Sequence, residues 1–333
     1  MASQSSPGCT VSRRAVVGLT LALPVLVTGI RASAQTALRR IGILAQDLQP
    51  GLLETLRDEL ARLGHVEGRT LSIEVRNAAG RAERLPGLVA ELLQLKVEVI
   101  VAVNTPAAQA ARKATTMTPI VIMRVADPIG QGLVKSLTRP EGNVTGVSFM
   151  PDELGAKGVQ ILHEVMPNLT QIAALYQGDN PGARLVVTET ERRARLLGLR
   201  FLHLPIRDPA ELPGVFQTAV RAHVEGLFVM DDGAMTKLRR QITEQAARHN
   251  LPVVSIYRDL VEAGGLIAYG PSLTAVYRRG AGYVDRILRG ARPTDLPVEL
   301  PTQFDLAINL KTAKALGLTI PPSVLLRADH VIE

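Results

Sequence analysis

The sequence predicts an α/β protein made of two doubly wound lobes, each with a parallel sheet, joined by a hinge. Short apolar, β-rich runs alternate with amphipathic helical patterns through most of the 333 residues. Strands that are apolar on both faces and separated by such helices are typical of a parallel sheet covered on both sides. The alternation runs through the chain twice, over roughly 110 residues each time, and this length suits two domains.

The first series begins with the strand RRIGILA at Arg39 and a helical stripe of leucines that stops at Gly64. The strand TLSIEVR and a second leucine-striped helix follow. The remaining segments are, in order, VEVIVAV, a helix from Pro106, PIVIMRV, a helix from Pro128 and the strand VTGVSF.

The second series repeats this order. It contains a helix over 152–165, QIAALYQ, a helix from Pro181, RFLHLPI, a helix to about His223, GLFVMD, a helix to His249 and LPVVSIY. The junctions VTGVSF and GLIAYG have the composition of strands, and a third crossing is expected near 298–305. Such junctions favour hinged lobes with a cleft between them over independent domains.

These crossings set the expected domain boundaries. Lobe 1 is expected to comprise residues 36–147 plus about 268–298, and lobe 2 residues 148–267 plus about 299–333.

The first 34 residues have the pattern of a signal peptide. Arg13 and Arg14 precede an uncharged apolar stretch, and Ala32-Ser33-Ala34 supplies the small residues that signal peptidase requires. The apolar stretch is short for a membrane anchor. We therefore expect cleavage after Ala34 and a periplasmic protein. SRRAVVG resembles the twin-arginine pattern but lacks its usual aromatic residue, so both export routes stay open.

Composition and motifs argue against several functions. After removal of the leader, 35 basic and 31 acidic residues remain, scattered without a basic run, so nucleic-acid binding is not expected. The six histidines are dispersed, and the chain has no HExxH, GxSxG, P-loop or GxGxxG pattern. We expect no enzyme activity, no cofactor and no metal.

Helix-capping residues follow four of the predicted strands, where ligands bind in parallel sheets. Thr105, Asp127 and Asn180 each precede a proline that would open a helix, and Asp231 or Asp232 follows the strand GLFVMD. Plain capping explains each of them equally well. The functional hypothesis is that Thr105 and the first-turn N–H groups hold a carboxylate, while Asp127 or Asp231 holds an ammonium.

Aromatic residues are scarce, so their positions carry information. Tyr176, Tyr257 and Tyr269 all lie at or after the ends of predicted strands. A tyrosine there could stack on a ligand and hydrogen-bond to it, or simply fill the end of the sheet. The pattern does not choose between these roles.

Long stretches of the chain resemble the ABC-transporter substrate-binding family often labelled tryptophan/tyrosine-type, which has the type I periplasmic-binding-protein fold. The similar stretches are LARLGHVEGRTLSIEVR, RLPGLVAELLQLKVEVIVA with NTPAAQAARKAT, DPIGQGLVKSLTRPEGNVTGVS, LVEAGGLIAYGPS and the C-terminal YVDRILRGARPTDLPVELPTQFDLAINLKTAKALGLTIPPSVLLRADHVIE. The resemblance implies capture of a small solute, ABC permease subunits as partners, and a monomer without catalysis.

One candidate ligand-binding position departs from the family pattern. Asn104 stands where relatives commonly have glycine, so the loop before Thr105 is expected to be shaped differently. For this reason the resemblance supports an amino acid or related small acid only as a general class of ligand.

Two alternatives remain open from the sequence. The same fold serves sensory binding proteins that signal to a membrane receptor, and neighbouring genes for a permease and an ATPase would favour import over sensing. An exported two-lobed enzyme would need a catalytic acid or base and a nucleotide or metal site, and none is evident. A repressor is disfavoured because the leader occupies the place of a helix-turn-helix.

Overall fold

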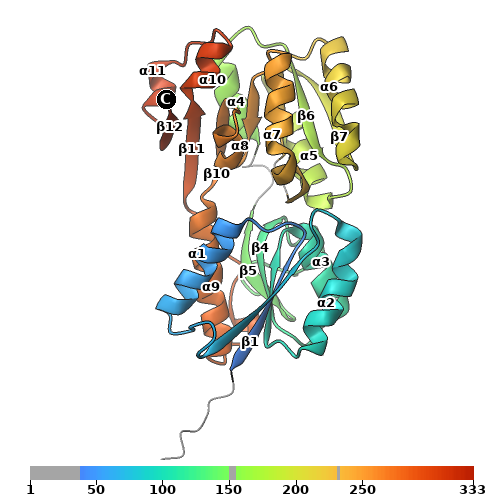
Figure 1. Cartoon of the computed structure of the whole chain (residues 1–333), viewed down its shortest axis with the longest axis vertical. Helices are drawn as coiled ribbons and strands as arrows, with labels where there is room; N and C mark the ends of the chain where they lie inside the picture. The colour runs from blue at the N-terminus through green and yellow to red at the C-terminus, as the bar shows by residue number, and fades with distance from the viewer. Residues whose placement is uncertain (1–37, 150–154, 231–232) are drawn as a thin grey trace, which may run out of the picture. The chain divides into compact units, whose positions relative to one another are not determined.

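The computed structural model describes residues 38–149, 155–230 and 233–333, and these contain two α/β lobes (Figure 1). The expected leader and Asp231 lie outside the described residues. Within the described ranges, no helix is long and apolar enough to cross a membrane.

The first lobe contains a five-stranded parallel sheet in the order β2-β1-β3-β4-β5. Its strands are β1 (Arg39–Ala45), β2 (Leu71–Asn77), β3 (Val99–Val103), β4 (Ile120–Ala126) and β5 (Val144–Phe149). Its helices are α1 (Pro50–Arg62), α2 (Leu85–Gln94), α3 (Thr105–Ala114) and α9 (Leu273–Leu288).

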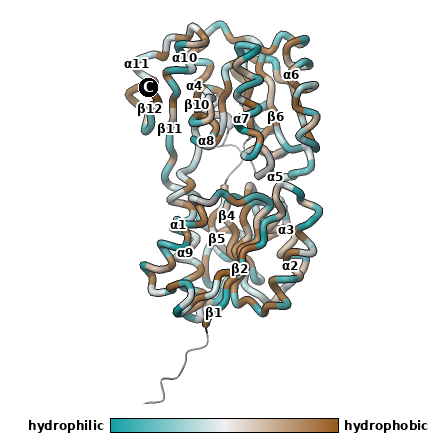
Figure 2. The backbone as a smooth tube through the Cα atoms, in the orientation of Figure 1, coloured by the Kyte–Doolittle hydropathy of each residue, from teal (hydrophilic) through white to brown (hydrophobic). Residues whose placement is uncertain are grey.

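Helices cover both faces of this sheet because its strands are apolar on both sides. Ile41 and Ile43 pack in the cluster that contains the apolar residues of α1 and α9. Leu44 and Ile100 pack in a separate cluster with α2 and α3. Figure 2 shows the hydrophobic strands grouped between these helices. Alternate strand residues therefore pack on opposite faces of the sheet, which confirms the doubly wound arrangement predicted from the apolar runs.

The second lobe contains a seven-stranded sheet in the order β12-β11-β10-β9-β8-β6-β7. Its strands are β6 (Gln171–Gln177), β7 (Arg200–Ile206), β8 (Gly226–Val229), β9 (Val253–Ser255), β10 (Ile267–Pro271), β11 (Phe304–Asn309) and β12 (His330–Ile332). Its helices are α4 (Ala156–Val165), α5 (Pro181–Leu196), α6 (Leu212–Arg221), α7 (Gly233–Arg248), α8 (Arg258–Glu262), α10 (Leu310–Ala315) and α11 (Pro322–Leu325).

The two sheets share one topology. If strands are numbered from the start of each series, both run 2-1-3-4-5, with β11 and β12 added beyond the fifth strand of the second lobe. In the second lobe, β11 runs antiparallel to β10. In this order, successive strands are added on one side of the first strand and then on the other, while the neighbouring strands stay parallel. The change of side, a topological switch point, lies between β1 and β3 and again between β6 and β8.

The chain passes between the lobes after β5, after β10 and between Glu299 and Phe304. Residues 267–271 pair with β9 and β11 of the second sheet, so the return into the first lobe begins at Ser272 rather than near 268. In the third crossing, Glu299 bridges Val147, and its carbonyl accepts a hydrogen bond from the Ser148 N–H at 2.9 Å.

The helix predicted from Pro128 is wrong. Residues 128–132 form turns, in which the Gln131 N–H donates to the Asp127 carbonyl at 3.0 Å and the Leu133 N–H to that of Pro128 at 2.9 Å. Gly130 and Gly132 weaken any helix there. Gly132 has φ +69°, which ends the turn.

Candidate functional site

The two switch points are each bordered by polar residues. Gln46 directly follows β1 and Asn104 follows β3, while Gln177 ends β6 and Asn180 precedes α5. All four are buried, with 0%, 3%, 6% and 3% of their surfaces exposed. Ligands of open α/β sheets bind beyond the carboxyl ends of strands at such points.

A hydrogen bond joins the two switch points. The Gln46 Nε2 donates to Gln177 Oε1 at 2.9 Å, and also to the carbonyl of Gly80 at 3.2 Å. Nearby, the Lys237 ammonium lies 3.3 Å from the Asp47 carboxylate. Neither glutamine was predicted from the sequence, because an amide at a strand end has no distinctive pattern and these two residues are far apart in the chain.

Asn104, not Thr105, caps α3. Its Oδ1 accepts a hydrogen bond from the Ala107 N–H at 3.3 Å, and its backbone has φ 78° and ψ 167°. This conformation is nearly confined to glycine. The prediction of Thr105 as the cap is wrong. The left-handed backbone of Asn104 places the Asn104 side chain, not that of Thr105, within reach of the first-turn N–H groups of α3. The Asn104 Nδ2 is buried and has no hydrogen-bond partner among the residues described.

Thr105 lies against the first turn of α5 in the other lobe. A Cβ atom on Gly182 would fall 2.4 Å from Thr105 Oγ1, so only glycine fits there. Asn180 caps α5 as predicted, accepting from the N–H groups of Gly182 at 3.0 Å and Ala183 at 3.4 Å. The N-termini of α3 and α5 therefore meet, which brings two predicted site residues together.

Tyr257 belongs to a second group of residues that spans the lobes. The Arg124 guanidinium of β4 lies 4.6 Å from the centre of its ring, a distance suited to a cation–π interaction. Arg124 also lies near Tyr277 of α9. Burial raises the pKa of the Tyr277 hydroxyl to about 12, although Arg124 opposes this by favouring the phenolate. Neither Arg124 nor Tyr277 was predicted, since each occurs within an apolar strand or helix pattern.

The other predicted residues lie apart from these groups. The Asp127 Oδ1 accepts from the Gly130 N–H at 2.9 Å, so its carboxylate caps its own turn. The Tyr176 hydroxyl lies 3.3 Å from His203 Nδ1 on the edge strand β7. Asp231 falls outside the described residues. The structure thus brings together Asn104, Thr105 and Asn180 at the meeting of α3 and α5, and places Tyr257 in the separate group with Arg124. Asp127 and Tyr176 belong to neither group.

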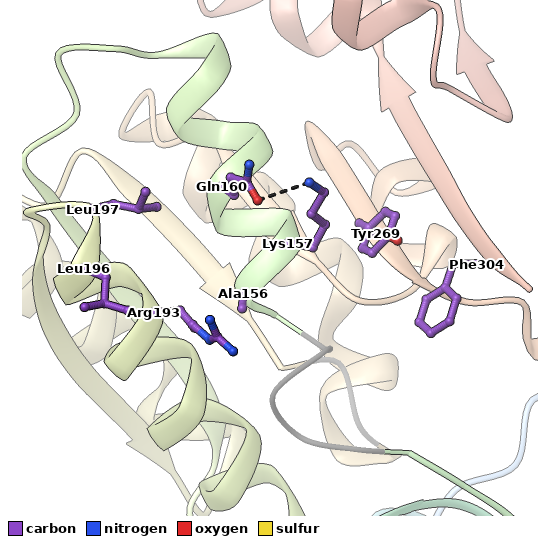
Figure 3. A pocket seen from close by; sticks show the side chains of 8 residues that line it. All are labelled: Ala156, Lys157, Gln160, Arg193, Leu196, Leu197, Tyr269 and Phe304. Carbon is purple, nitrogen blue, oxygen red and sulfur yellow. Dashed lines mark hydrogen bonds between the residues drawn. The ribbon is translucent and has the colours of Figure 1, made fainter. Parts of the chain in front are cut away.

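Tyr269 lines a hollow built only from second-lobe residues. Its ring stacks on Phe304 with centres 5.8 Å apart, and the hollow has a volume of about 540 Å³. Figure 3 shows Tyr269 and Phe304 across from Arg193 and Leu196, with Lys157 between them. Tyr269 is therefore separate from the switch points.

Two hollows open where first-lobe and second-lobe residues face each other. One has a volume of about 300 Å³ and the other about 630 Å³, and both are lined by Gln49 and Asp259. Tyr257 lines the smaller one and Asp47 with Lys237 the larger. In the part of the chain that the structure describes, no three His, Cys, Asp or Glu side chains gather as metal ligands would. The arrangement is suited to holding a small polar molecule between lobes.

A two-lobed α/β fold with paired switch points indicates the class of solute-binding proteins. It does not identify a particular ligand. The family model for "ABC transporter substrate binding protein" matches residues 44–332. The chain belongs to the family of ABC transporter substrate-binding proteins. It therefore functions in binding a small solute for an ABC importer, and members of this family work outside the cytoplasm.

Several known proteins are similar to this chain. A tyrosine-binding protein of Clostridioides difficile is 25% identical over 269 residues, 80% of this chain and 76% of that protein. The structure of an ABC domain from Streptococcus pneumoniae in complex with L-Trp has 27% identity and a TM-score of 0.82, over 89% of this chain and 100% of that one. A conserved domain protein from Vibrio cholerae has the same identity and TM-score, over 88% of this chain and 99% of that one.

Proposed function

We propose that this protein captures an amino acid or a related small acid between its lobes and delivers it to an ABC permease in the cytoplasmic membrane. The observation that carries the proposal is the hydrogen bond between Gln46 and Gln177, which joins the switch points of the two sheets. A solute bound there would contact both lobes at once. The tyrosine-binding and L-Trp-bound relatives support this class of ligand.

The proposed site consists of residues at the four strand ends. Asn104 and Thr105 contribute from the first lobe, and Asn180 and Tyr257 from the second, together with the two glutamines. Polar groups placed at a few points in a concave site fix the orientation of a ligand and give specificity. Asp231 remains part of the proposal from its position after β8.

Export precedes binding in this proposal. Residues 1–34 form the signal peptide, Gln35 is the mature N-terminus, and the mature monomer works in the periplasm. Sequencing the N-terminus of protein from a periplasmic fraction checks this step. Recovery of an intact Met1 in the membrane fraction would contradict it.

The ligand class can be tested by thermal shift on purified residues 35–333. The panel contains amino acids, small aromatic and aliphatic acids, and neutral and cationic solutes. A true ligand at 100 times its dissociation constant adds about 2.7 kcal/mol to the free energy of unfolding. We expect an amino acid or small acid to raise the melting temperature and the neutral and cationic solutes to leave it unchanged.

Thr105→Ala and Thr188→Ala make a matched pair for this experiment. Thr105 is buried where α3 meets α5, whereas Thr188 is exposed on α5 and donates only to the Arg184 carbonyl. Thr105→Ala should weaken ligand binding about tenfold, as expected for the loss of one hydrogen bond, and Thr188→Ala should not. Equal affinities would place the ligand away from the switch points.

A further inference from the structure

The hollow beside Tyr269 takes no part in the proposed solute site. It lies in the second lobe alone, between α4, the end of α5 and the strands β10 and β11 (Figure 3). Small-molecule sites are concave, with volumes of about 300–1,000 Å³, and are lined mainly by apolar and aromatic side chains with a few polar groups. This hollow has a volume of about 540 Å³, and its lining fits that description.

Two aromatic rings form one wall of the hollow. The rings of Tyr269 and Phe304 are stacked, with 14° between their planes, and both residues are half-buried. On the opposite side, Leu196 is 73% exposed and Leu197 37% exposed (Figure 3). A flat aromatic ligand would cover this apolar surface and stack on the rings, which is a favourable arrangement for aromatic groups. The wall therefore favours a ligand with an aromatic body.

The residues that line the hollow carry two positive charges and no carboxylate. The Lys157 ammonium of α4 donates a hydrogen bond to Gln160 Oε1 at 3.1 Å, and this partner is neutral. Arg193 of α5 is exposed and makes no ion pair or hydrogen bond within the described part of the chain. Both charges are therefore left uncompensated beside an apolar surface.

Two other arginines on α5 differ from Arg193 in this respect. Arg192 lies 2.8 Å from the carboxylate of Glu189, and Arg195 lies 2.6 Å from that of Glu191. Glutamates one turn away compensate these two charges, as is common on helix surfaces. Arg193 lines the hollow instead, where its guanidinium is available to an anion.

We propose that this hollow is a second binding site, separate from the solute site between the lobes, and that it takes an aromatic phosphate monoester. The aromatic body lies against Tyr269 and Phe304, and the phosphate contacts Lys157 and Arg193. A phosphate monoester carries a charge of about −1.5 to −2 at pH 7, which matches the two positive charges. Guanidinium and ammonium groups both bind phosphate oxygens. Because the site is complete within the second lobe, it does not depend on solute capture.

Isothermal titration calorimetry of the mature protein with 1-naphthyl phosphate tests the proposal. Three comparison ligands each lack one feature: 1-naphthol has no charge, 1-naphthalenesulfonate has a single charge, and inorganic phosphate has no aromatic body. Naphthyl phosphate should bind about tenfold more tightly than 1-naphthol and inorganic phosphate, because each of these satisfies only one part of the lining. It should bind about threefold more tightly than 1-naphthalenesulfonate, which balances one of the two positive charges.

Variants locate the bound probe. Lys157→Gln and Arg193→Gln should each weaken naphthyl phosphate binding about threefold, and the double variant about tenfold, since solvent-exposed charges contribute modestly. Phe304→Leu should weaken it about fivefold, because leucine has no ring on which the naphthyl group can stack. Arg192→Gln is the matched control: it removes an exposed arginine from the same helix, but one that pairs with Glu189. It should leave the affinity unchanged within about 1.5-fold.

Several results would overturn the proposal. Absence of naphthyl phosphate binding, or equal binding of 1-naphthol, would mean that the hollow is not an anion site. Equal binding of inorganic phosphate or of 1-naphthalenesulfonate would rule out the aromatic phosphate as the ligand class. A double variant that is folded by circular dichroism and binds naphthyl phosphate like wild type would place the probe elsewhere. If Phe304→Leu does not fold, the surface changes Lys157→Gln and Arg193→Gln decide the result. None of these outcomes affects solute capture between the lobes.

Discussion

The two lobes have the same strand order, but they differ in how many strand residues have an unfavourable backbone conformation. In each, the fifth strand contains a glycine whose added Cβ would lie 2.2 Å from a backbone oxygen, that of Ile122 for Gly146 and that of Ile256 for Gly270. Among the described residues, left-handed non-glycine residues at strand ends or in strands occur only in the first lobe, at Asn104, Arg124 and Asp127. The same scaffold is thus regular in one lobe and distorted in the other, where it presents a buried charge.

This difference suggests a division of roles between the lobes. The first lobe positions Arg124 and Asn104 through unfavourable backbone conformations, which are retained where function requires them. The second lobe contributes an ordinary helix cap, Asn180, and the face of an aromatic ring, Tyr257. The strained backbone at strand ends is therefore a feature of the first lobe alone among the described residues.

The largest expected effect comes from the two fifth-strand glycines. Gly146→Ala adds both a clash and a strained φ, so it should lower the free energy of unfolding by roughly 4 kcal/mol. Gly270→Ala adds the clash without a left-handed φ and should cost roughly 2 kcal/mol. Urea denaturation monitored by circular dichroism measures both values.

Gly282→Ala is the control for this pair. Gly282 lies within α9, and an added Cβ would meet nothing within 4 Å. Alanine there should stabilise the protein by about 0.5–1 kcal/mol through helix propensity. If Gly146→Ala and Gly270→Ala cost the same, the proposed difference in strain between the lobes is incorrect.

An intermediate effect is expected at the contact between the switch points. Gln46→Leu or Gln177→Leu leaves the partner amide buried without its hydrogen bond, which should cost about 1–3 kcal/mol. The double variant removes both polar groups and should cost less than the two single changes added together. Strict additivity in urea denaturation would mean that the two amides do not interact in solution.

Much of the fold could be predicted because apolar runs define buried strands. The predicted strands QIAALYQ, RFLHLPI and VTGVSF match β6, β7 and β5 residue for residue. The alternation of apolar runs with amphipathic helical patterns predicted both lobes. The predicted helix at Pro128 fails because two glycines and a left-handed turn outweigh the signal of a proline after an aspartate.

The candidate site was less predictable, for physical reasons. Asn180 could be predicted as a cap because its backbone is ordinary, with φ −88° and ψ 109°. The cap at Asn104 depends on a φ angle that no residue pattern encodes. Gln46 and Gln177 become partners only when two lobes fold, and Arg124 is hidden in the apolar run IVIMRVA, where a bulge was not foreseen.

The smallest expected effect distinguishes the two asparagine caps. Asn104→Gly should raise the free energy of unfolding by about 1 kcal/mol, because glycine adopts φ 78° and ψ 167° without strain and loses little as a cap. Asn180→Gly should lower it by a few tenths of a kcal/mol, since its conformation is already relaxed. Asn104→Ala keeps the strain and loses the cap, so it should cost about 1 kcal/mol. Urea denaturation measures the sign of the change in the free energy of unfolding for all three variants.

Calorimetry with the acid that the wild-type protein binds then measures the effect of Asn104→Gly on ligand affinity. Asn104→Gly should bind that acid more weakly despite its greater stability, because the Nδ2 donor is gone. A stabilised Asn104→Gly protein with unchanged affinity would mean that the strain at Asn104 does not serve ligand binding.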